Sequence, residues 1–306
     1  MCNQVSKHTN PREKTMKKVL LATSALFLTA GVASAEITFS GTAGAGVIKS
    51  GDVRTGDTPD TAGKYQVYSG IDINVSASAT ADNGMVLTAT TDIGGGALAD
   101  VADKEINNQG NTLDTVGFSA SYNGMTVALK SDGQDDLYDD DQNGDVKVSG
   151  SMGGLTYAVV SDTNDSEYSY SLGFAAGDVA ITAIGTSADD AGDAAMKVSA
   201  AYTMGDVKLT LTSDNKGAAD TLNTVAVAYT AGALSLTASA TNGKVDGKAE
   251  YDLGVSYKAG AATVSMKTDE SSAWEADVAY DLGGGVSAVI AGDHNNTILA
   301  GMSFAF

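Results

Sequence analysis

Carboxylates crowd the segment between residues 132 and 145, and crowded carboxylates bind hard cations. Its acids are Asp132, Asp135, Asp136, Asp139, Asp140, Asp141 and Asp145. Side chains of like charge repel one another unless a cation neutralises them, and calcium prefers oxygen ligands. Asp139, Asp141 and Asn143 match the opening of a calcium loop, but Gly150 stands where that loop needs a bidentate glutamate. The pattern excludes an EF-hand and leaves weak Ca2+ binding by these carboxylates open.

Catalytic side chains are scarce in the rest of the chain. It has one cysteine and two histidines, and Cys2 and His8 lie in a segment that we expect to be removed. Without them, cysteine nucleophiles, thiolate metal sites and sites with several histidines are excluded. A Ser-His-Asp triad would need His294, for which a solvated loop histidine is the simpler interpretation. We therefore expect no enzyme activity. An enzyme such as a lipase, built on the β-barrel that is predicted below, stays only as an alternative.

The beginning of the chain has the layout of an export signal. Lys17 and Lys18 form a positive region, residues 19–30 are apolar, and Ala33-Ser34-Ala35 is a cleavage site of the A-x-A kind. We predict a Sec signal peptide over residues 16–35, cleaved after Ala35. No later apolar run is long enough for a membrane-spanning helix.

Residues 1–15 precede a second, better placed methionine, and we expect them to be an upstream extension. Residues 36–306 would then be the mature protein, as one domain. They hold 13 basic and 37 acidic side chains, a formal charge of -24. Such an acidic chain disfavours a nucleic-acid partner, because the phosphate backbone is itself negative.

From Glu36 onward the sequence alternates with a period of two, which predicts strands with two different faces. In the last segment, Ile298, Met302 and Phe304 fall on one face, and Ser303 falls on the other. The same alternation recurs at 207–212, 263–267 and 274–282. One face is apolar, and the other is small, hydroxylated or charged.

Short and long connections alternate between these segments. Tight turns that suit hairpins occur at 82–84, 123–124, 153–154, 177–178, 205–206, 231–232, 259–260 and 283–285. Longer polar loops lie between them, at 50–64, 94–113, 132–144, 162–166, 187–194, 214–222, 242–247, 269–272 and 293–295. Short turns at one end and long loops at the other are typical of a transmembrane antiparallel β-barrel in an outer membrane.

Two soluble folds fit parts of this pattern. An antiparallel sandwich also alternates, but it would collect large aliphatic side chains in a core and expose long charged ones. Here the polar face is mostly Ser, Thr, Ala and Gly. A calcium-binding β-solenoid suits the abundant Asp and Gly, but the glycine triplets 94–96 and 283–285 do not begin the short repeat that it needs. The barrel accounts for the whole mature chain.

Three features resemble the trimeric general-diffusion porins of Gram-negative outer membranes. The signal peptide runs directly into EITFSG from Glu36, the hairpin 280–288 reads YDLGGGVSA, and the last strand ends in Phe306. The resemblance implies a passive water-filled channel for small hydrophilic solutes and ions. It also implies a homotrimer in a bilayer with lipopolysaccharide, and recognition of Phe306 by the barrel-assembly machinery. The alternative function is a plugged barrel with a structural or adhesive role.

The resemblance and the sequence give different strand numbers. The resemblance implies sixteen strands and a third long loop that folds into the barrel. In the sequence, eight tight turns join sixteen strands in pairs, and the terminal segments 37–49 and 297–306 add one each. The chain itself therefore predicts eighteen.

If the apolar face contacts lipid, the opposite face lines water. Six lysines then fall on lumen positions: Lys130, Lys147, Lys197, Lys208, Lys258 and Lys267. The resemblance implies that the acidic loop 132–144 faces these lysines across a constriction, although this loop is shorter than usual for the family. Further acids fall in the lumen and the loops, for example Asp72, Asp252, Glu275, Asp277 and Asp281. Because the net charge is negative, we expect mild cation selectivity.

Overall fold

The computed structural model describes residues 35–49, 51, 63–138, 143–188, 192–215, 221–242 and 249–306. The predicted upstream extension and all but the last residue of the predicted signal peptide lie outside these ranges. Asp139, Asp140 and Asp141 of the acidic loop also lie outside them.

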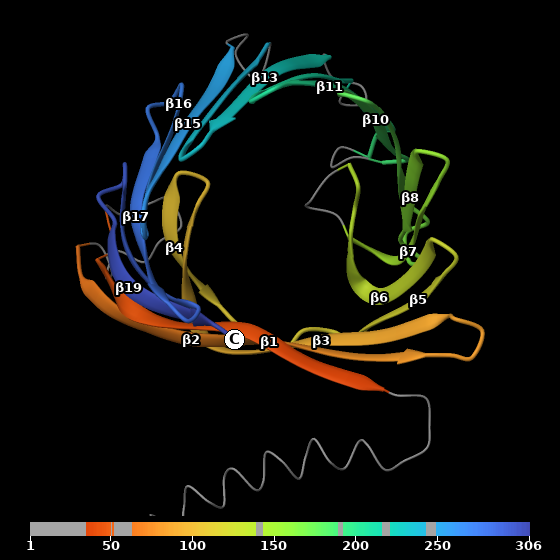
Figure 1. Ribbon diagram of the computed structural model, residues 1–306, viewed down its shortest axis with the longest axis horizontal. Helices are drawn as coiled ribbons and strands as arrows, with labels where there is room; N and C mark the ends of the chain where they lie inside the picture. The colour runs from red at the N-terminus through yellow and green to blue at the C-terminus, as the bar shows by residue number, and fades with distance from the viewer. Residues whose placement is uncertain are drawn as a thin grey trace, which may run out of the picture.

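The described residues form one sheet of nineteen antiparallel strands, which closes into a barrel (Figure 1). The strands are β1 (Glu36–Lys49), β2 (Tyr65–Thr80), β3 (Val86–Ala102), β4 (Glu105–Gly110), β5 (Gly117–Tyr122), β6 (Met125–Asp135), β7 (Asn143–Met152), β8 (Leu155–Ser161), β9 (Tyr168–Ala176), β10 (Val179–Thr186), β11 (Ala195–Met204), β12 (Val207–Asp214), β13 (Leu222–Ala231), β14 (Leu234–Thr241), β15 (Glu250–Ala259), β16 (Ala262–Asp269), β17 (Trp274–Gly283), β18 (Val286–Asp293) and β19 (Ile298–Ala305). The described ranges contain no helix that is long and apolar enough to cross a membrane.

Eighteen of these strands form the barrel wall. β1 pairs with both β2 and β19, which closes the barrel, and β3 pairs with β2 and β5. β4 pairs with the far end of β3 and lies inside the barrel. The count of eighteen made from the sequence is therefore confirmed. The sixteen strands implied by the family resemblance are wrong for this chain, because all eight tight turns and both terminal segments belong to wall strands.

All eight tight turns lie at the end of the barrel that also holds Glu36 and Phe306. Their sequences suit this role, because two-residue hairpins need left-handed backbone. Asn123 and Gly124, which join β5 to β6, have φ values of 49° and 79°. The strand ends that the long connections join lie at the opposite end, as the alternation of short and long loops predicted.

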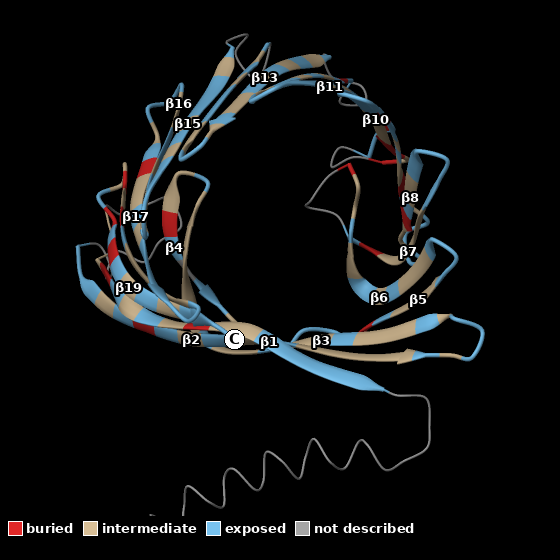
Figure 2. Ribbon diagram, viewed as in Figure 1, coloured by how far each residue is buried: buried red, intermediate tan, exposed pale blue. Residues whose placement is uncertain are grey.

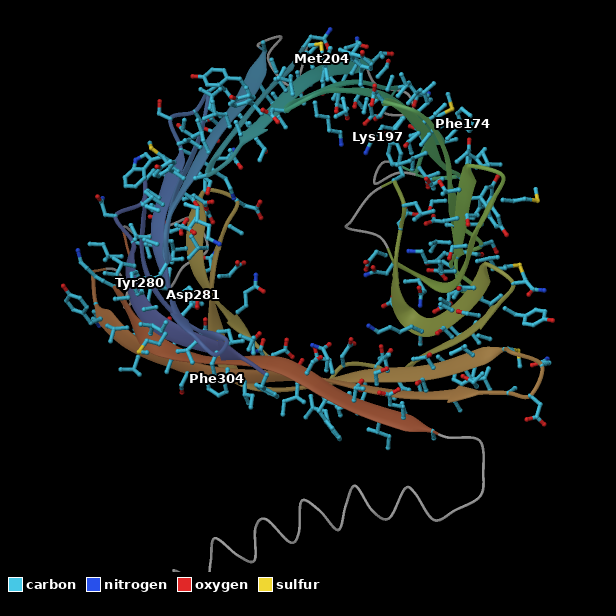
Figure 3. The ribbon with its side chains drawn as sticks, in the orientation of Figure 1. Phe174, Lys197, Met204, Tyr280, Asp281 and Phe304 are labelled. Atoms are coloured by element: carbon cyan, nitrogen blue, oxygen red, sulfur yellow. The ribbon has the colours of Figure 1, made fainter. Side chains whose placement is uncertain are left out.

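The pairing register separates an outer apolar face from an inner polar face. Leu209 lies opposite Val227, while the next pair joins Lys208 to Ala228. Side chains directly opposite each other in a sheet share a face, so the whole wall alternates in step. Figure 3 shows outward side chains at Phe174, Met204, Tyr280 and Phe304, and inward side chains at Lys197 and Asp281.

Buried residues gather on two parts of the wall rather than along the whole barrel (Figure 2). The first group comprises Ile48, Tyr68, Ile106, Glu275, Ala291, Asp293, Thr297 and Leu299. The second comprises Tyr138, Val160, Ser169, Thr186, Ala188, Ala195 and Asp214. A barrel wall one strand thick buries little by itself, so each group marks a place where another segment covers the inner face.

Candidate pore constriction

The first covering segment is the hairpin of β3 and β4, which leaves the wall at a glycine triplet. β3 pairs with β2 as far as Gly96 and with β4 from Ala97 onward. Gly96 has a φ of 75°, and a Cβ there would lie 2.2 Å from the Ser69 carbonyl oxygen. Only glycine allows both the left-handed backbone and this close approach. The triplet 94–96 is therefore the bend that sends the chain into the barrel.

Residues 94–113 were predicted to be one of the longer polar loops, and this prediction was wrong. The segment is a regular hairpin inside the barrel (Figure 1). Asp103 and Lys104 form its two-residue turn, with φ values of 54° and 65°. The error arose because Asp and Lys are ordinary loop residues, whereas the inner position depends on contacts with distant strands.

Apolar side chains seat the hairpin on the wall. Ile106 of β4 is 2% exposed and packs in a cluster with wall side chains, against which partly buried residues of β3 and β18 also pack. The wall members are Ile48, Tyr68, Ala291 and Leu299, and the partly buried residues are Ala99, Val101 and Val289. Leu299 is fully buried although it lies on the inner face, where water would otherwise reach it. The hairpin thus removes an apolar patch of the lumen wall from water.

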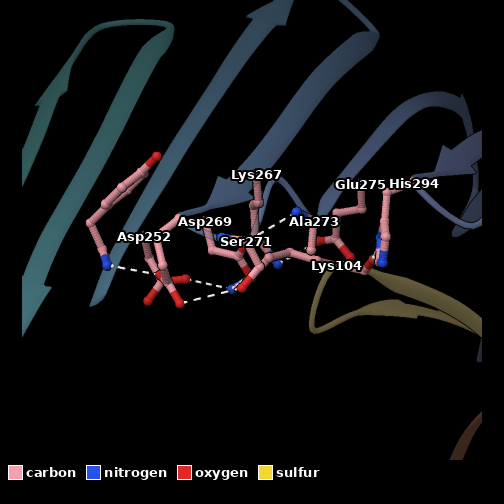
Figure 4. A network of polar contacts seen from close by, with 10 residues as sticks. Lys104, Asp252, Lys267, Asp269, Ser271, Ala273, Glu275 and His294 are labelled. Carbon is pink, nitrogen blue, oxygen red and sulfur yellow. Dashed lines mark hydrogen bonds and ion pairs between the residues drawn. The ribbon is translucent and has the colours of Figure 1, made fainter. Parts of the chain in front are cut away.

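Charged side chains fix the tip of the hairpin. Lys104 forms ion pairs of 2.5 Å with Asp252 on β15 and 2.9 Å with Asp269 on β16 (Figure 4). Burial disfavours the ammonium form of Lys104. The hydrogen bonds that Lys104 donates to the two carboxylates outweigh that cost and raise the pKa of Lys104 above its ordinary value. Lys104 therefore stays charged at any physiological pH.

Two residues of β18 and its following loop hold the backbone of the same hairpin. The buried Asp293 carboxylate accepts a hydrogen bond from the Ile106 backbone N–H at 3.0 Å. The His294 Nδ1 atom lies 3.1 Å from the Lys104 carbonyl oxygen. Among the described residues no serine hydroxyl is bonded to His294. The ring that a catalytic triad would have needed thus contacts the hairpin backbone.

The second covering segment is the described part of the acidic loop, up to Tyr138. The Leu137 N–H donates to Ser169 Oγ at 2.9 Å, and the buried Tyr138 hydroxyl donates to the Asp214 carboxylate. Lys197 of β11 donates to the Tyr138 carbonyl oxygen at 3.2 Å. These contacts hold the segment against the inner face of β9, β11 and β12, across the barrel from β4 (Figure 1).

Three acids of this loop that the sequence singled out are described. The Asp132 backbone N–H donates to the Asp145 carboxylate at 2.8 Å, and the Asp136 carboxylate accepts from the Tyr138 N–H at 2.7 Å. Asp135 is exposed at the end of β6. Neither Asp132 nor Asp135 forms an ion pair with a lysine of the described wall. Of the proposed calcium ligands, Asn143 is the only one within the described ranges.

All six predicted lumen lysines occupy inner positions in the register. Lys130 pairs with Asp114 at 2.6 Å, and Lys267 pairs with the buried Glu275 at 2.7 Å. Lys197 contacts Tyr138 and lies opposite Asp214 in the register. The other three are Lys147, Lys208 and Lys258. Lys130 therefore pairs with a carboxylate at the base of the inner hairpin, and Lys267 pairs with one on the wall. Neither of these two ion pairs involves the acidic loop.

Sequence reasoning missed Lys104, Asp114 and Asp269, although a signal for the hairpin was present. Residues 97–102 and 105–110 flank a two-residue polar turn and follow three glycines, which is the pattern of a short hairpin. Nothing in the sequence pairs Lys104 with Asp252, because 148 positions separate them.

A polar hollow of about 260 Å³ lies beside the base of the hairpin. Its lining includes the carboxylates Asp72, Asp92 and Asp114 and the side chains of residues 111–112. Within the described ranges, however, no three acidic, histidine or cysteine side chains are placed to hold a metal ion. The hollow is thus a negatively charged part of the lumen.

Comparisons with known proteins agree with this architecture. Two engineered variants of the porin of Rhodopseudomonas blastica are 18% identical, have TM-scores of 0.55, and align over 89% of this chain and 100% of theirs. A structure described as asymmetric conductivity of engineered proteins is 15% identical, with a TM-score of 0.53 and the same coverage. These likenesses show the fold. No curated protein sequence matches the chain.

The family comparison is more specific. A family described as Gram-negative porin matches residues 22–301, which is most of the chain. That match agrees with a closed barrel whose outer face is apolar and whose inner face is polar. The chain belongs to the Gram-negative porin family and forms a general-diffusion channel of the outer membrane.

Proposed function

We propose that the channel conducts small hydrophilic solutes and ions passively, without catalysis, and prefers cations mildly. The observation that supports this is the charge of the inner face. Inward carboxylates on β2, β3, β15, β16 and β17 outnumber the lysines beside them. They include Asp72, Asp92, Asp252, Asp269, Glu275, Asp277 and Asp281. A negatively charged lumen raises the local concentration of cations.

Planar-bilayer recording of the refolded mature protein tests this proposal. We expect discrete conductance steps that grow with salt concentration, and a reversal potential in a salt gradient that has the sign of cation flow. The six lumen lysines temper the field, so the preference should be small and should weaken further at high salt. Anion preference would refute the selectivity. Absence of steps would favour the plugged barrel.

Export and assembly follow from the two ends of the chain. We propose cleavage after Ala35, insertion through the barrel-assembly machinery, and a homotrimer surrounded by lipopolysaccharide and bilayer lipid. Phe306 supports the assembly signal: its backbone exchanges two hydrogen bonds of 3.0 Å with Gly41, and its side chain is 49% exposed on the lipid face. N-terminal sequencing of the exported protein and cross-linking in the membrane test cleavage and trimer.

We also propose weak Ca2+ binding by the acidic loop between residues 132 and 145. Support comes from the number of carboxylates over a short stretch of chain. Each carboxylate makes the local electrostatic potential more negative, which favours binding of a divalent cation. Equilibrium dialysis at millimolar Ca2+ should show uptake that falls when Asp139 and Asp141 are changed to Asn. No uptake at that concentration would remove the proposal.

A further inference from the structure

The inner hairpin of β3 and β4 is packed where it leaves the wall. A Cβ added at Gly94 would lie 2.4 Å from Asn111 Cβ, and one added at Gly96 would lie 2.2 Å from the Ser69 carbonyl oxygen. The base is therefore fixed, and the contacts of the rest of the hairpin with the inner wall determine where its tip lies. Those contacts are the apolar seat of Ile106, the Asp293 and His294 bonds, and the two ion pairs of Lys104.

The charges around Lys104 give it a particular role. Asp252 and Asp269 lie directly opposite each other in the register of β15 and β16, so their carboxylates repel. On the hairpin, Asp103 and Glu105 flank Lys104 in the sequence. On the wall, Lys267 is engaged by Glu275, and the neighbouring Asp293 and Asp277 are also acidic. Lys104 thus places a cation beside two wall carboxylates that repel each other.

We propose that Lys104 is a positioning residue for conduction, which latches the β3–β4 hairpin to the β15–β16 wall and keeps the pore open. With Lys104 charged, the hairpin tip is attracted to the wall. Without that charge, the tip loses both of its ion pairs, and Asp252 and Asp269 repel each other with no ammonium group between them. The released tip then moves toward the pore axis, where it obstructs ion flow.

This proposal rests on the channel function, and its test separates the two. Lys104→Gln removes both ion pairs with little change of length, and Lys104→Arg keeps them. Lys49→Gln is the matched control, because Lys49 lies opposite the exposed Tyr65 and Ile298 on the outer face. In bilayer recordings, the Gln variant at 104 should close several-fold more often at a given voltage. The Arg variant and the Lys49 control should behave as the unmodified protein does.

A second measurement does not depend on conduction. The mature chain has no cysteine, so Asp103→Cys gives a single labelling site at the hairpin tip for a spin label. Adding Lys104→Gln should increase the mobility of the label, while adding Lys104→Arg should not. Unchanged closing frequency and unchanged label mobility in the Gln variant would overturn the latch. An unmodified protein that does not conduct would instead contradict the channel, and the label would still report on the latch.

Charge reversal completes the test. Lys104→Asp should close the channel more often than Lys104→Gln, because it places a carboxylate at the tip where Lys104 meets Asp252 and Asp269. Combining it with Asp269→Lys restores one opposite pair between hairpin and wall, and should recover most of the open time. Failure of this double variant to recover, when Asp269→Lys alone conducts normally, would show that Lys104 acts in another way.

Discussion

The ammonium group of Lys197 lies 4.7 Å from the centre of the Tyr138 ring and donates a hydrogen bond to the Tyr138 carbonyl oxygen at 3.2 Å. The same tyrosine donates its hydroxyl proton to Asp214, which lies opposite Lys197 in the register of β11 and β12. One side chain of the acidic loop thus engages both members of a charged wall pair. The two inward segments are fastened in similar ways, each by a lysine and a carboxylate on facing elements.

Removal of the Tyr138 hydroxyl should loosen this fastening. A hydrogen bond to a charged group contributes about 1.5–3 kcal/mol, so Tyr138→Phe should lower the free energy of unfolding by about that amount. Denaturant unfolding of the refolded barrel in lipid measures it. Tyr229→Phe is the control, because Tyr229 lies opposite Leu236 and Val207 on the outer face. Equal losses in both variants would contradict the assignment.

Leu299 should be the most sensitive position of the apolar seat. It is fully buried beneath the hairpin, and truncation of a buried leucine to alanine costs about 2–5 kcal/mol. Leu299→Ala should therefore lower the free energy of unfolding of the barrel by about that amount, and it should speed amide hydrogen exchange in β4. Ile298→Ala, one residue away on the lipid face and 52% exposed, should do much less. An equal loss of stability in Ile298→Ala would contradict the burial of Leu299 beneath the hairpin.

The selectivity of the pore should follow its inner charges. Asp281→Asn removes an exposed carboxylate that points into the barrel, so it should reduce the cation preference. Lys208→Gln should increase it, because it removes an inward positive charge. Reversal potentials at low and high salt measure both shifts, which should shrink as salt screens the field. Lys49→Gln, on the outer face, should leave the reversal potential unchanged.

Acid should disrupt the Asp114–Lys130 pair only at low pH. The hydrogen bond from Lys130 holds the pKa of the Asp114 carboxyl below its usual value. A carboxyl with a lowered folded pKa adds stability above its unfolded pKa, which is about 3.9. That stability is lost as pH falls through the lowered value. The Asp114 side chain is 44% exposed, so the effect on stability should be small. Carboxyl NMR titration should show a higher midpoint in Lys130→Gln, and an unchanged midpoint would contradict the pairing.

The end of the chain should control assembly more than stability. Phe304 and Phe306 are neighbours on the lipid face, with ring centres 5.9 Å apart. We expect Phe306→Ser to reduce the amount of folded protein in the outer membrane, while Phe304→Ser reduces it less. Cell fractionation measures both, and refolding of the purified Phe306→Ser protein from denaturant should succeed. Failure to refold would mean that the residue acts through stability.

The sequence by itself determined the wall of the barrel. Alternation along each strand placed apolar side chains such as Tyr280 outside and polar ones such as Asp281 inside, and the eight tight turns set the number of strands. These features are local: each hairpin pairs neighbours in the chain, and the bilayer imposes one apolar face on every strand. That is why eighteen strands could be counted before any contact was known.

Only the tertiary structure decided what fills the barrel. Residues 94–113 look like an ordinary polar loop until Ile106 meets Leu299 and Lys104 meets Asp252, and these partners lie far away in the sequence. Attraction between charges and burial of apolar surface depend on distance in space, which alternation does not encode. No partner of Lys104 can be predicted from the sequence, because the closure of the barrel is what brings β15 and β16 beside the hairpin.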